Sequence, residues 1–435
     1  MDAATWSIIV LIGGFFVLLM LKVPVSFSML IATLGSAAIY GINFSDIVNQ
    51  MITGVKSFSL LAIPFFILMG EFMSAGGISE KIVDFANLCV GRFQGGLAYV
   101  NCLDSMFFGG VSGSAVADVS SLGSVVIPMM KKAGYNDDFA VGLTVCTACQ
   151  GLLIPPSHNM VIYALAAGGG VTIGALFMAG AIPGILLGLS IMLYCFCIRK
   201  KYNFPVGVGV SKGKRTKIIV NAILPMMTLV IIMGGMAAGV FTATEAAAIA
   251  CIYTFILTYF VFRSAKLRDI GVVFKNALKT LAIVLTLISV AKAFAFMMVV
   301  LHVPDMLTHL LVSVTSNKYL LLLIINVLLL VLGCFMDMAP LIMIMTPILL
   351  PVVTGPAIGL SPVHFGIIMI FNLAIGLCTP PVGSALFVGC AVGKTPIERT
   401  SMHMLPMYAV MVIGLLVITF VPFVSMWLPT VLGML

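Results

Sequence analysis

Runs of about 20 apolar residues recur along the chain, and each is long enough to cross the hydrocarbon core of a bilayer as a helix. The uninterrupted runs cover 5–21, 25–40, 58–75, 174–198, 218–240, 243–262, 280–301 and 405–428. Only 8% of the residues are charged, which is too few to coat a water-soluble protein of 435 residues. The pattern predicts an all-α polytopic membrane protein. It excludes a soluble enzyme, a nucleic-acid-binding domain and a disordered chain.

Four other apolar stretches are interrupted by glycine, proline and polar residues. We expect 97–130 and 320–353 to form re-entrant hairpins, and 138–170 and 363–393 to form discontinuous helices. An irregular backbone survives at membrane depth only where protein or a polar cavity satisfies its hydrogen bonds. The interruptions therefore indicate where a functional site lies.

The basic residues indicate the orientation, because cytoplasmic loops of membrane proteins are rich in Lys and Arg. The loops within 199–217 and 263–279 carry the densest basic clusters. If both are cytoplasmic, all but three of the 22 basic residues fall on that side, the exceptions being Lys56, Lys318 and the mid-span Lys292. Both termini are then periplasmic. The net charge of +8 reflects topology, and we expect no nucleic-acid partner.

Two long segments of the chain match each other. Each copy has a glycine four residues before a proline pair, Pro155-Pro156 in the first and Pro380-Pro381 in the second. Asp118 and Asp337 each precede a proline by ten residues, which predicts equivalent positions. The topology opens the first hairpin to the cytoplasm and the second to the periplasm, so the repeat is inverted. Inverted repeats with paired broken helices are typical of secondary transporters whose site lies near the midplane.

The breaks bring together groups suited to a hard cation such as Na+. Proline removes a backbone donor and ends the preceding helix, so unwound carbonyls become available. Hydroxyl and carbonyl oxygens are the ligands that hard cations prefer. The candidate Na+ ligands are Ser112, Gly113, Ser114, Asp118 and Pro155 in the first half, and Asp337, Met338, Thr379, Pro380 and Gly383 in the second. The alternative is that these small residues only permit tight hairpin packing.

Half-helix N-termini carry partial positive charge and favour an anion nearby. The candidate substrate-binding residues are polar side chains near the tips and breaks, together with one mid-span lysine: Ser112, Ser114, Ser157, His158, Asn159, Ser384 and Lys292. Lys292 could neutralise a substrate carboxylate or form a structural ion pair. Glu71, Asp104 and Glu245 lie near span ends, where a structural cap or an interhelical hydrogen bond is expected. We expect no organic cofactor.

Seven motifs point to one family. They are SLLAIPFFILMGEFMSAGG, SGSAVAD, IPMMKKAGY, IPPSHNMVIY, LFMAGAIPG, FTATEAAA and GLCTPPVG. Over nearly its whole length the chain resembles the large membrane (DctM-like) subunit of tripartite ATP-independent periplasmic (TRAP) transporters. The resemblance implies the fold of the ion-transporter superfamily, in which a transport domain holding both hairpins moves as an elevator against a scaffold. It also implies three partners: a small four-helix (Q-type) membrane subunit, a periplasmic substrate-binding protein and an organic acid substrate.

The expected organisation follows the repeat. A scaffold and arm helix occupy 1–92, and a hairpin, a broken helix and a following helix occupy 93–198. After a basic cytoplasmic linker at 199–217, the same order returns in 218–318 and 319–435.

The expected function is Na+-coupled secondary active import of an organic acid across the bacterial inner membrane, with no enzymatic activity. The histidine and asparagine of IPPSHNMVIY favour sialic acid or another sugar acid. The alternatives are a stand-alone Na+/dicarboxylate symporter of the same superfamily and a C4-dicarboxylate TRAP transporter. The second tip reads MDMAP, without the serines of the first, so backbone ligation is favoured there.

Overall fold

The computed structural model describes residues 2–207, 212–315, 317–356 and 358–435. Within these residues the chain is helical, and the only extended pairing is an isolated bridge between Gln94 and Val206. Seven helices in this part of the chain are long and apolar enough to cross a membrane, or eight if the bent pair α5 and α6 is one span. The protein is therefore a multi-pass membrane protein, as predicted.

The first half contains α1 (Ala3–Ile8), η1 (Ile9–Gly14), α2 (Phe15–Met20), α3 (Val25–Tyr40), α4 (Phe44–Val55), η2 (Phe58–Leu61), α5 (Ala62–Ala75), α6 (Ile78–Val90), α7 (Gly96–Ser112), α8 (Ala115–Lys132), α9 (Asp137–Ala148), η3 (Cys149–Leu152), α10 (His158–Ala166) and α11 (Ile173–Ile198). The second half contains η4 (Lys212–Lys214), α12 (Arg215–Ala237), α13 (Ala243–Ile256), η5 (Leu257–Val261), η6 (Leu267–Asp269), α14 (Ile270–Val300), α15 (Val303–Val314), α16 (Lys318–Phe335), α17 (Met338–Thr354), α18 (Pro362–Leu377), α19 (Ser384–Gly393), α20 (Ile397–Phe420) and α21 (Phe423–Val431).

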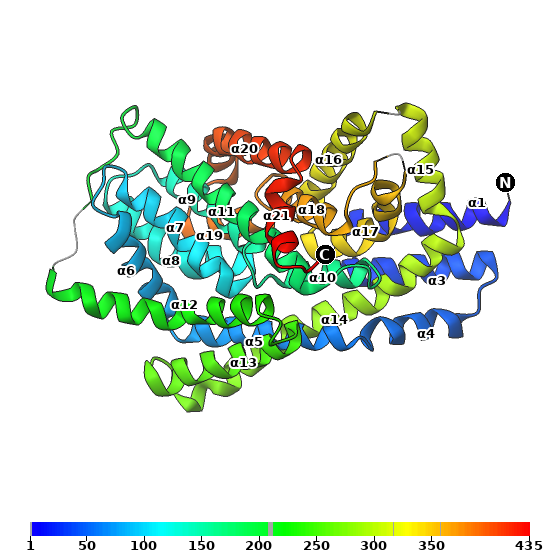
Figure 1. Ribbon diagram of the computed structural model, residues 1–435. Coiled ribbons are helices and arrows are strands. Elements are labelled where there is room, and N and C mark those ends of the chain that lie inside the picture. Colours follow the sequence, from blue (N-terminus) through cyan, green and yellow to red (C-terminus); the bar gives the residue numbers. More distant parts are fainter. Residues whose placement is uncertain (1, 208–211, 316, 357) are drawn as a thin grey trace.

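The same order of elements occurs twice. A helical pair, α7 with α8, precedes the interrupted helix α9–α10 and the long helix α11. The pair α16 with α17 precedes the interrupted helix α18–α19 and the long helix α20. Figure 1 shows α7 and α8 on the left and α16 and α17 on the right, so the two pairs approach the centre from opposite sides. The interruptions expected in 138–170 and 363–393 are therefore present.

One predicted run is wrong at its end. The run at 405–428 is not a single helix, because α20 ends at Phe420 and α21 begins at Phe423. Pro422 stands between them and has no N–H to continue the backbone ladder. The predicted run at 280–301 is the second part of α14, which begins ten residues earlier, at Ile270.

The pairing of Asp118 with Asp337 is also wrong. Ser114 is the N-cap of α8, and Asp337 is the N-cap of α17. Pro128 lies 14 residues after the first cap, and Pro351 lies 14 residues after the second. Asp337 therefore corresponds to Ser114, while Asp118 lies in the first turn of α8. The spacing misled because α17 contains two prolines, and the nearer one gave the wrong register.

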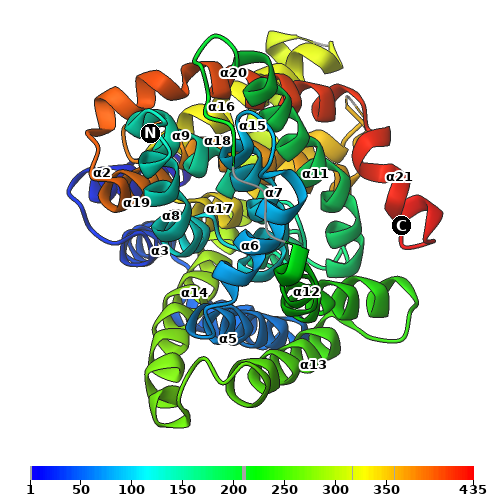
Figure 2. The ribbon, with the colours of Figure 1, turned by 90° about the vertical axis from the view of Figure 1, so that its left-hand side faces the viewer.

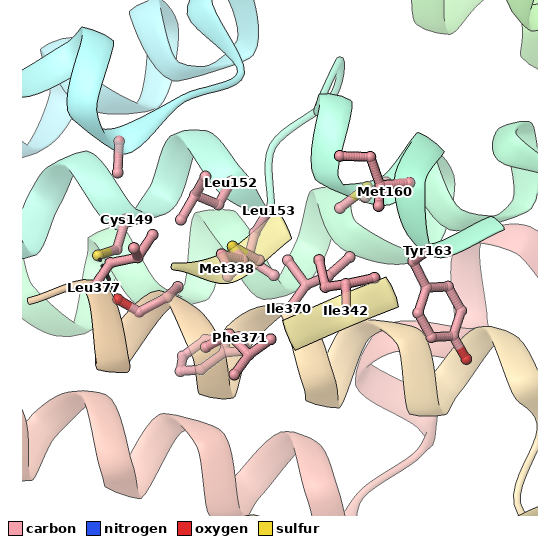
Figure 3. Packing of buried hydrophobic residues seen from close by; sticks show 14 of the residues in the cluster. Cys149, Leu152, Leu153, Met160, Tyr163, Met338, Ile342, Ile370, Phe371 and Leu377 are labelled. Carbon is pink, nitrogen blue, oxygen red and sulfur yellow. Dashed lines mark hydrogen bonds between the residues drawn. The ribbon is translucent and has the colours of Figure 1, made fainter. Parts of the chain in front are cut away.

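The core lies where the two interrupted helices and the second helical pair meet. Figure 3 shows Leu152 and Leu153 beside Met338 and Ile342 of α17, with Phe371 of α18 below them. All five side chains are buried. Figures 1 and 2 place α5, α12, α13 and α14 together along one side of the molecule, apart from most of this core.

Interhelical hydrogen bonds join the first helix of each hairpin, α7 or α16, to the broken helix of the same half. In the first half, Asn101 Nδ2 donates to Thr144 Oγ1 at 2.7 Å, and Thr147 Oγ1 donates to Asn101 Oδ1 at 3.1 Å. In the second half, Asn372 Nδ2 donates to Asn326 Oδ1 at 2.9 Å. Such bonds satisfy polar groups that apolar surroundings would otherwise leave unpaired. They hold hairpin and broken helix together as one unit in each half.

Candidate ion and substrate site

The first hairpin ends in a single tight turn. α7 ends at Ser112 and α8 begins after Ser114, while Gly113 between them has φ +61°. A side chain would be strained in that left-handed conformation. A Cβ built on Gly113 would lie 2.7 Å from the Pro156 carbonyl oxygen and 3.5 Å from the backbone nitrogen of His158. The tip therefore rests directly on the first helix break.

The break itself presents backbone oxygens to the hairpin. The chain is irregular between η3 and α10, where Pro155 and Pro156 are joined by a cis peptide bond. A Cβ built on Gly110 would lie 2.9 Å from the Pro155 carbonyl oxygen. The carbonyl oxygens of both prolines thus lie close to the first hairpin, near its tip.

Asp118 lies buried behind the tip. Ser112 Oγ donates a hydrogen bond of 2.5 Å to Asp118 Oδ1. Asp118 Oδ2 and the buried Ser157 Oγ have no hydrogen-bond partner among the described residues. Burying such groups without a partner is unfavourable, and a bound cation would relieve the cost. Hydroxyl, carbonyl and carboxylate oxygens are also the donor set that Na+ fits. We name these residues, Ser112–Ser114, Asp118 and Pro155–Ser157, the first junction.

A cavity of about 390 Å³ adjoins the first junction. We name it the tip cavity. On the hairpin side it is lined by Ser112, Gly113, Ser114, Ser120, Ser121, Pro156 and His158, and on the other side by Glu71 and Ser74 of α5 and Thr280 of α14, with Phe66, Ile67, Met69, Gly70, Phe108, Val116 and Ala117 completing the wall. Hydroxyl groups therefore face the cavity from both sides.

Three acids expected to be structural behave differently from one another. Glu245 is a helix cap, as expected, because its carboxylate and the Thr242 hydroxyl form a capping box at the start of α13. Glu71 lies within α5, on the wall of the tip cavity and of a neighbouring 520 Å³ cavity that also contains Lys266 and Asp269. Asp104 is buried in α7, and neither of its carboxylate oxygens has a hydrogen-bond partner in the described part of the chain. The expectation of a simple cap or interhelical hydrogen bond is wrong for Asp104. The sequence does carry a sign that Glu71 lies in a polar environment, because it is an acid inside the apolar run 58–75.

The second tip contacts the second break in the same way. Ser384, the first residue of α19, donates from Oγ to Asp337 Oδ1 at 3.3 Å. The backbone nitrogen of Val382 donates to the carbonyl oxygen of Cys334, at the end of α16, at 3.0 Å. Pro380 and Pro381 are joined by a cis peptide bond, as in the first break. We name Asp337 with residues 379–384 the second junction.

The remaining predicted ligands of the second junction differ in what they offer. Thr379 Oγ1 donates to the Ile375 carbonyl oxygen at 2.7 Å, which leaves its lone pairs available. Gly383 has φ +27°, and a Cβ there would lie 2.8 Å from the Thr379 carbonyl oxygen. The Met338 side chain is buried in the apolar core, so only its backbone could contribute an oxygen (Figure 3).

Pairs of glycines bring hairpin and broken helix into backbone contact at both junctions. A Cβ on Gly151 would lie 2.7 Å from Gly109 Cα, and a Cβ on Gly376 would lie 2.7 Å from Gly333 Cα. The Gly151 Cβ would also approach Asp118 Oδ2 to 3.0 Å. Larger residues at these positions would push the tips away from the breaks.

The predicted substrate-binding residues are spread over several places. Ser112, Ser114 and His158 line the tip cavity together. Ser157 and Asn159 are buried next to it, and Ser384 belongs to the second junction. Lys292 lies in a different cavity, between α4, α10 and α14. A lysine in the middle of an apolar span indicates that a cavity adjoins it. The position of Lys292 in the sequence does not show whether that cavity is the one beside the first junction or another one.

Repeated helical pairs seated on broken helices, within a bundle of membrane-spanning helices, define a class of membrane transporters. Two solved transporters share this fold. YdaH of Alcanivorax borkumensis superposes with a TM-score of 0.62 and 14% identity, covering 89% of this chain and 88% of that one. MtrF of Neisseria gonorrhoeae superposes with a TM-score of 0.61 and 12% identity, covering 88% of this chain and 83% of that one.

The sequence defines the family within that class. Residues 12–424 match the DctM component of the tripartite ATP-independent periplasmic transporter, and the chain belongs to this family. It is 38% identical to the sialic acid TRAP transporter large permease protein SiaM of Vibrio cholerae, over 96% of this chain and 97% of that protein. It is 37% identical to the C4-dicarboxylate large permease DctM of Pseudomonas aeruginosa, over 87% and 88%. It is 34% identical to the 2,3-diketo-L-gulonate large permease YiaN of Escherichia coli, over 95% of each. The protein is thus a transporter permease subunit and not an enzyme.

Proposed function

We propose that this chain is the translocating subunit of a Na+-coupled importer of an organic acid in the bacterial inner membrane. The observation that carries the proposal is the pair of junctions, in each of which a hairpin tip rests on the broken backbone of a helix. Both junctions offer the oxygen ligands that Na+ prefers. Na+ in the first junction would lie beside the tip cavity, where its charge favours a substrate carboxylate. Ion and anion would therefore bind cooperatively.

The walls of the tip cavity favour a hydroxylated acid as substrate. Serine hydroxyls, one threonine hydroxyl and His158 provide donors and acceptors for several substrate hydroxyl groups. A plain C4-dicarboxylate has fewer groups to satisfy these side chains. Relatives are named for sialic acid and for 2,3-diketo-L-gulonate, which agrees with a sugar acid. Relatives named for C4-dicarboxylates make that class the second candidate.

The proposed movement is that of an elevator. The transport elements are 93–198 and 319–435, which contain both junctions, and the scaffold elements are 1–92 and 218–318. The tip cavity supports this division, since α7, α8 and α10 wall it on one side and α5 and α14 on the other. Sliding of one group against the other would carry the first junction and its anion across the membrane. A small Q-type subunit would pack on the scaffold, and a periplasmic binding protein would deliver the substrate.

The proposed orientation has the basic linker 199–217 in the cytoplasm and both termini in the periplasm. In Figure 1 the N-terminus lies at the right end of the molecule, and α6 and residues 199–207 after α11 lie toward the left. The separation of the basic segments from the N-terminus is consistent with this orientation.

Uptake into proteoliposomes tests the proposal. The chain is reconstituted with its small subunit, and the cognate binding protein is loaded with radiolabelled N-acetylneuraminate, 2,3-diketo-L-gulonate or succinate. We expect an inward Na+ gradient to drive uptake without ATP, with a sugar acid preferred over succinate. Uptake that is equal with and without the gradient would reject Na+ coupling, and uptake by the chain alone would favour a stand-alone symporter.

A further inference from the structure

A second, larger cavity lies at the far end of α10. Its volume is about 860 Å³. The first residue of α10, His158, lines the tip cavity, while Ala164 and Leu165 in its last turn line this one. We name it the Lys292 cavity. The other residues that line it are Thr53, Gly54, Ser57 and Phe58 around the end of α4, Gly168, Gly169 and 171–174 before and at the start of α11, 241–244 at the start of α13, and Met236, Ile288, Met343 and Met434.

Lys292 supplies the one formal charge among the described lining residues of this cavity. Its side chain is exposed, although it lies within the long apolar helix α14. The ammonium group has no ion-pair partner in the described part of the chain. A lone ammonium at membrane depth is unfavourable unless a counter-charge or water reaches it. The cavity gives both of them room.

The aliphatic stem of Lys292 packs closely against Gly54 of α4. A Cβ built on Gly54 of α4 would lie 2.8 Å from Lys292 Cβ and 3.3 Å from Lys292 Cγ. The absent side chain at position 54 is what lets the lysine stem pass. The unpaired backbone N–H groups at the start of α11 add partial positive charge, and its first turn contains no acid to offset it. At the start of α13 the corresponding positive charge is offset by the carboxylate of Glu245.

We propose that the Lys292 cavity is a second binding site for the carboxylate of an organic anion, distinct from the tip cavity. The inference rests on the proposed function, since it makes this cavity the place where the anion waits before it reaches the first junction. In the proposed orientation, the loops around the cavity face the periplasm, where import begins. The two cavities are separated by the nine residues of α10, which correspond to roughly 13 Å of helix.

The charge preference of the cavity can be measured without knowing the substrate. Leu165→Cys places a reporter thiol on the wall of the Lys292 cavity, in a chain whose exposed Cys89 and Cys197 have been replaced by serine. The probes are a sulfonate-bearing methanethiosulfonate and its trimethylammonium analogue. Adding Lys292→Gln should lower the ratio of anionic to cationic labelling rates by about tenfold or more, as expected for loss of a nearby charge.

Lys56→Gln is the matched control, because Lys56 is exposed at the end of α4 but is absent from the lining of the cavity. It should change the ratio by less than about twofold, since its charge lies outside the cavity in which the reporter thiol reacts. An unchanged labelling ratio in the Lys292→Gln variant would overturn the proposal, whatever the uptake assay shows.

A second readout links the cavity to transport. In the reconstituted complex, Lys292→Gln should raise the KM for the transported anion by about tenfold, equivalent to 1.4 kcal/mol. Lys292→Arg should restore it to within about threefold, because arginine keeps the charge. A normal KM in the Lys292→Gln variant, in a complex whose wild type imports the anion, would contradict the inference while leaving the proposed function intact.

Discussion

At the scale of single residues, Asp118 is the side chain on which the proposed Na+ binding would depend most. It is buried, one oxygen accepts a hydrogen bond from Ser112, and the other has no partner among the described residues. Asp337 is exposed and is already bonded to Ser384. The two aspartates are therefore unequal, although their spacing in the sequence suggested equivalence.

The first prediction follows from that inequality. Asp118→Asn should raise the half-saturating Na+ concentration of uptake by about tenfold or more, equivalent to 1.4 kcal/mol, because it removes the buried negative charge. Asp337→Ala should weaken the Na+ dependence less, since solvent screens that carboxylate. Asp137→Asn, on the surface beside Lys131, is the control and should leave the Na+ titration unchanged. Equal titrations for wild type and Asp118→Asn would remove Asp118 from the site.

Sequence alone identified the residues of the first junction but not all of their neighbours. Ser112, Ser114 and His158 were found because they flank a tip and a break, and the structure brings them to one cavity. The place of Glu71 on the wall of the tip cavity was not visible in the sequence, since it depends on α5 packing across from the hairpin. Lys292 was placed with the substrate residues, because linear spacing does not show which wall of a bundle a helix faces.

At the scale of elements, the contact between hairpin and broken helix depends on glycine in both halves. Gly151→Ala and Gly376→Ala should each lower the thermal stability of the subunit and its uptake. A methyl group would meet the backbone of Gly109 or Gly333 at 2.7 Å, and such overpacking typically costs about 1–3 kcal/mol.

Gly271→Ala is the matched control for these two variants. Gly271 lies near the start of α14, and a Cβ there meets nothing within 4 Å. The substitution should leave uptake and stability unchanged or slightly improved, because alanine favours a helix more than glycine does. Full activity of both Gly151→Ala and Gly376→Ala would show that the close backbone contact is dispensable.

The elements that sequence reasoning missed share one property. α4, α6 and α15 were not among the predicted apolar runs, because polar residues interrupt each of them every few positions. A search for the 3.6-residue period of an amphipathic helix could have found them. By contrast, α3 covers the predicted range 25–40, and α11 begins within one residue of its prediction.

At the scale of the whole molecule, the two halves are joined so that the proposed transport elements can move together. Tyr163 of α10 donates to the Pro362 carbonyl oxygen, at the start of α18, at 2.7 Å. Arg399 of α20 pairs with the buried Asp138 of α9 at 2.6 Å. Each bond crosses from one repeat to the other. The repeats themselves are visible in the sequence. The bonds between them are not, because they depend on how the two repeats dock.

The central claim is that the two junctions couple Na+ to the movement of one organic anion. The most direct test counts radioactive Na+ and radiolabelled anion entering the same proteoliposomes, made with the complete complex. If each junction carries one ion, at least two Na+ ions should enter per anion, and Asp118→Asn should lower that ratio. Anion uptake unaccompanied by Na+ entry would contradict the account.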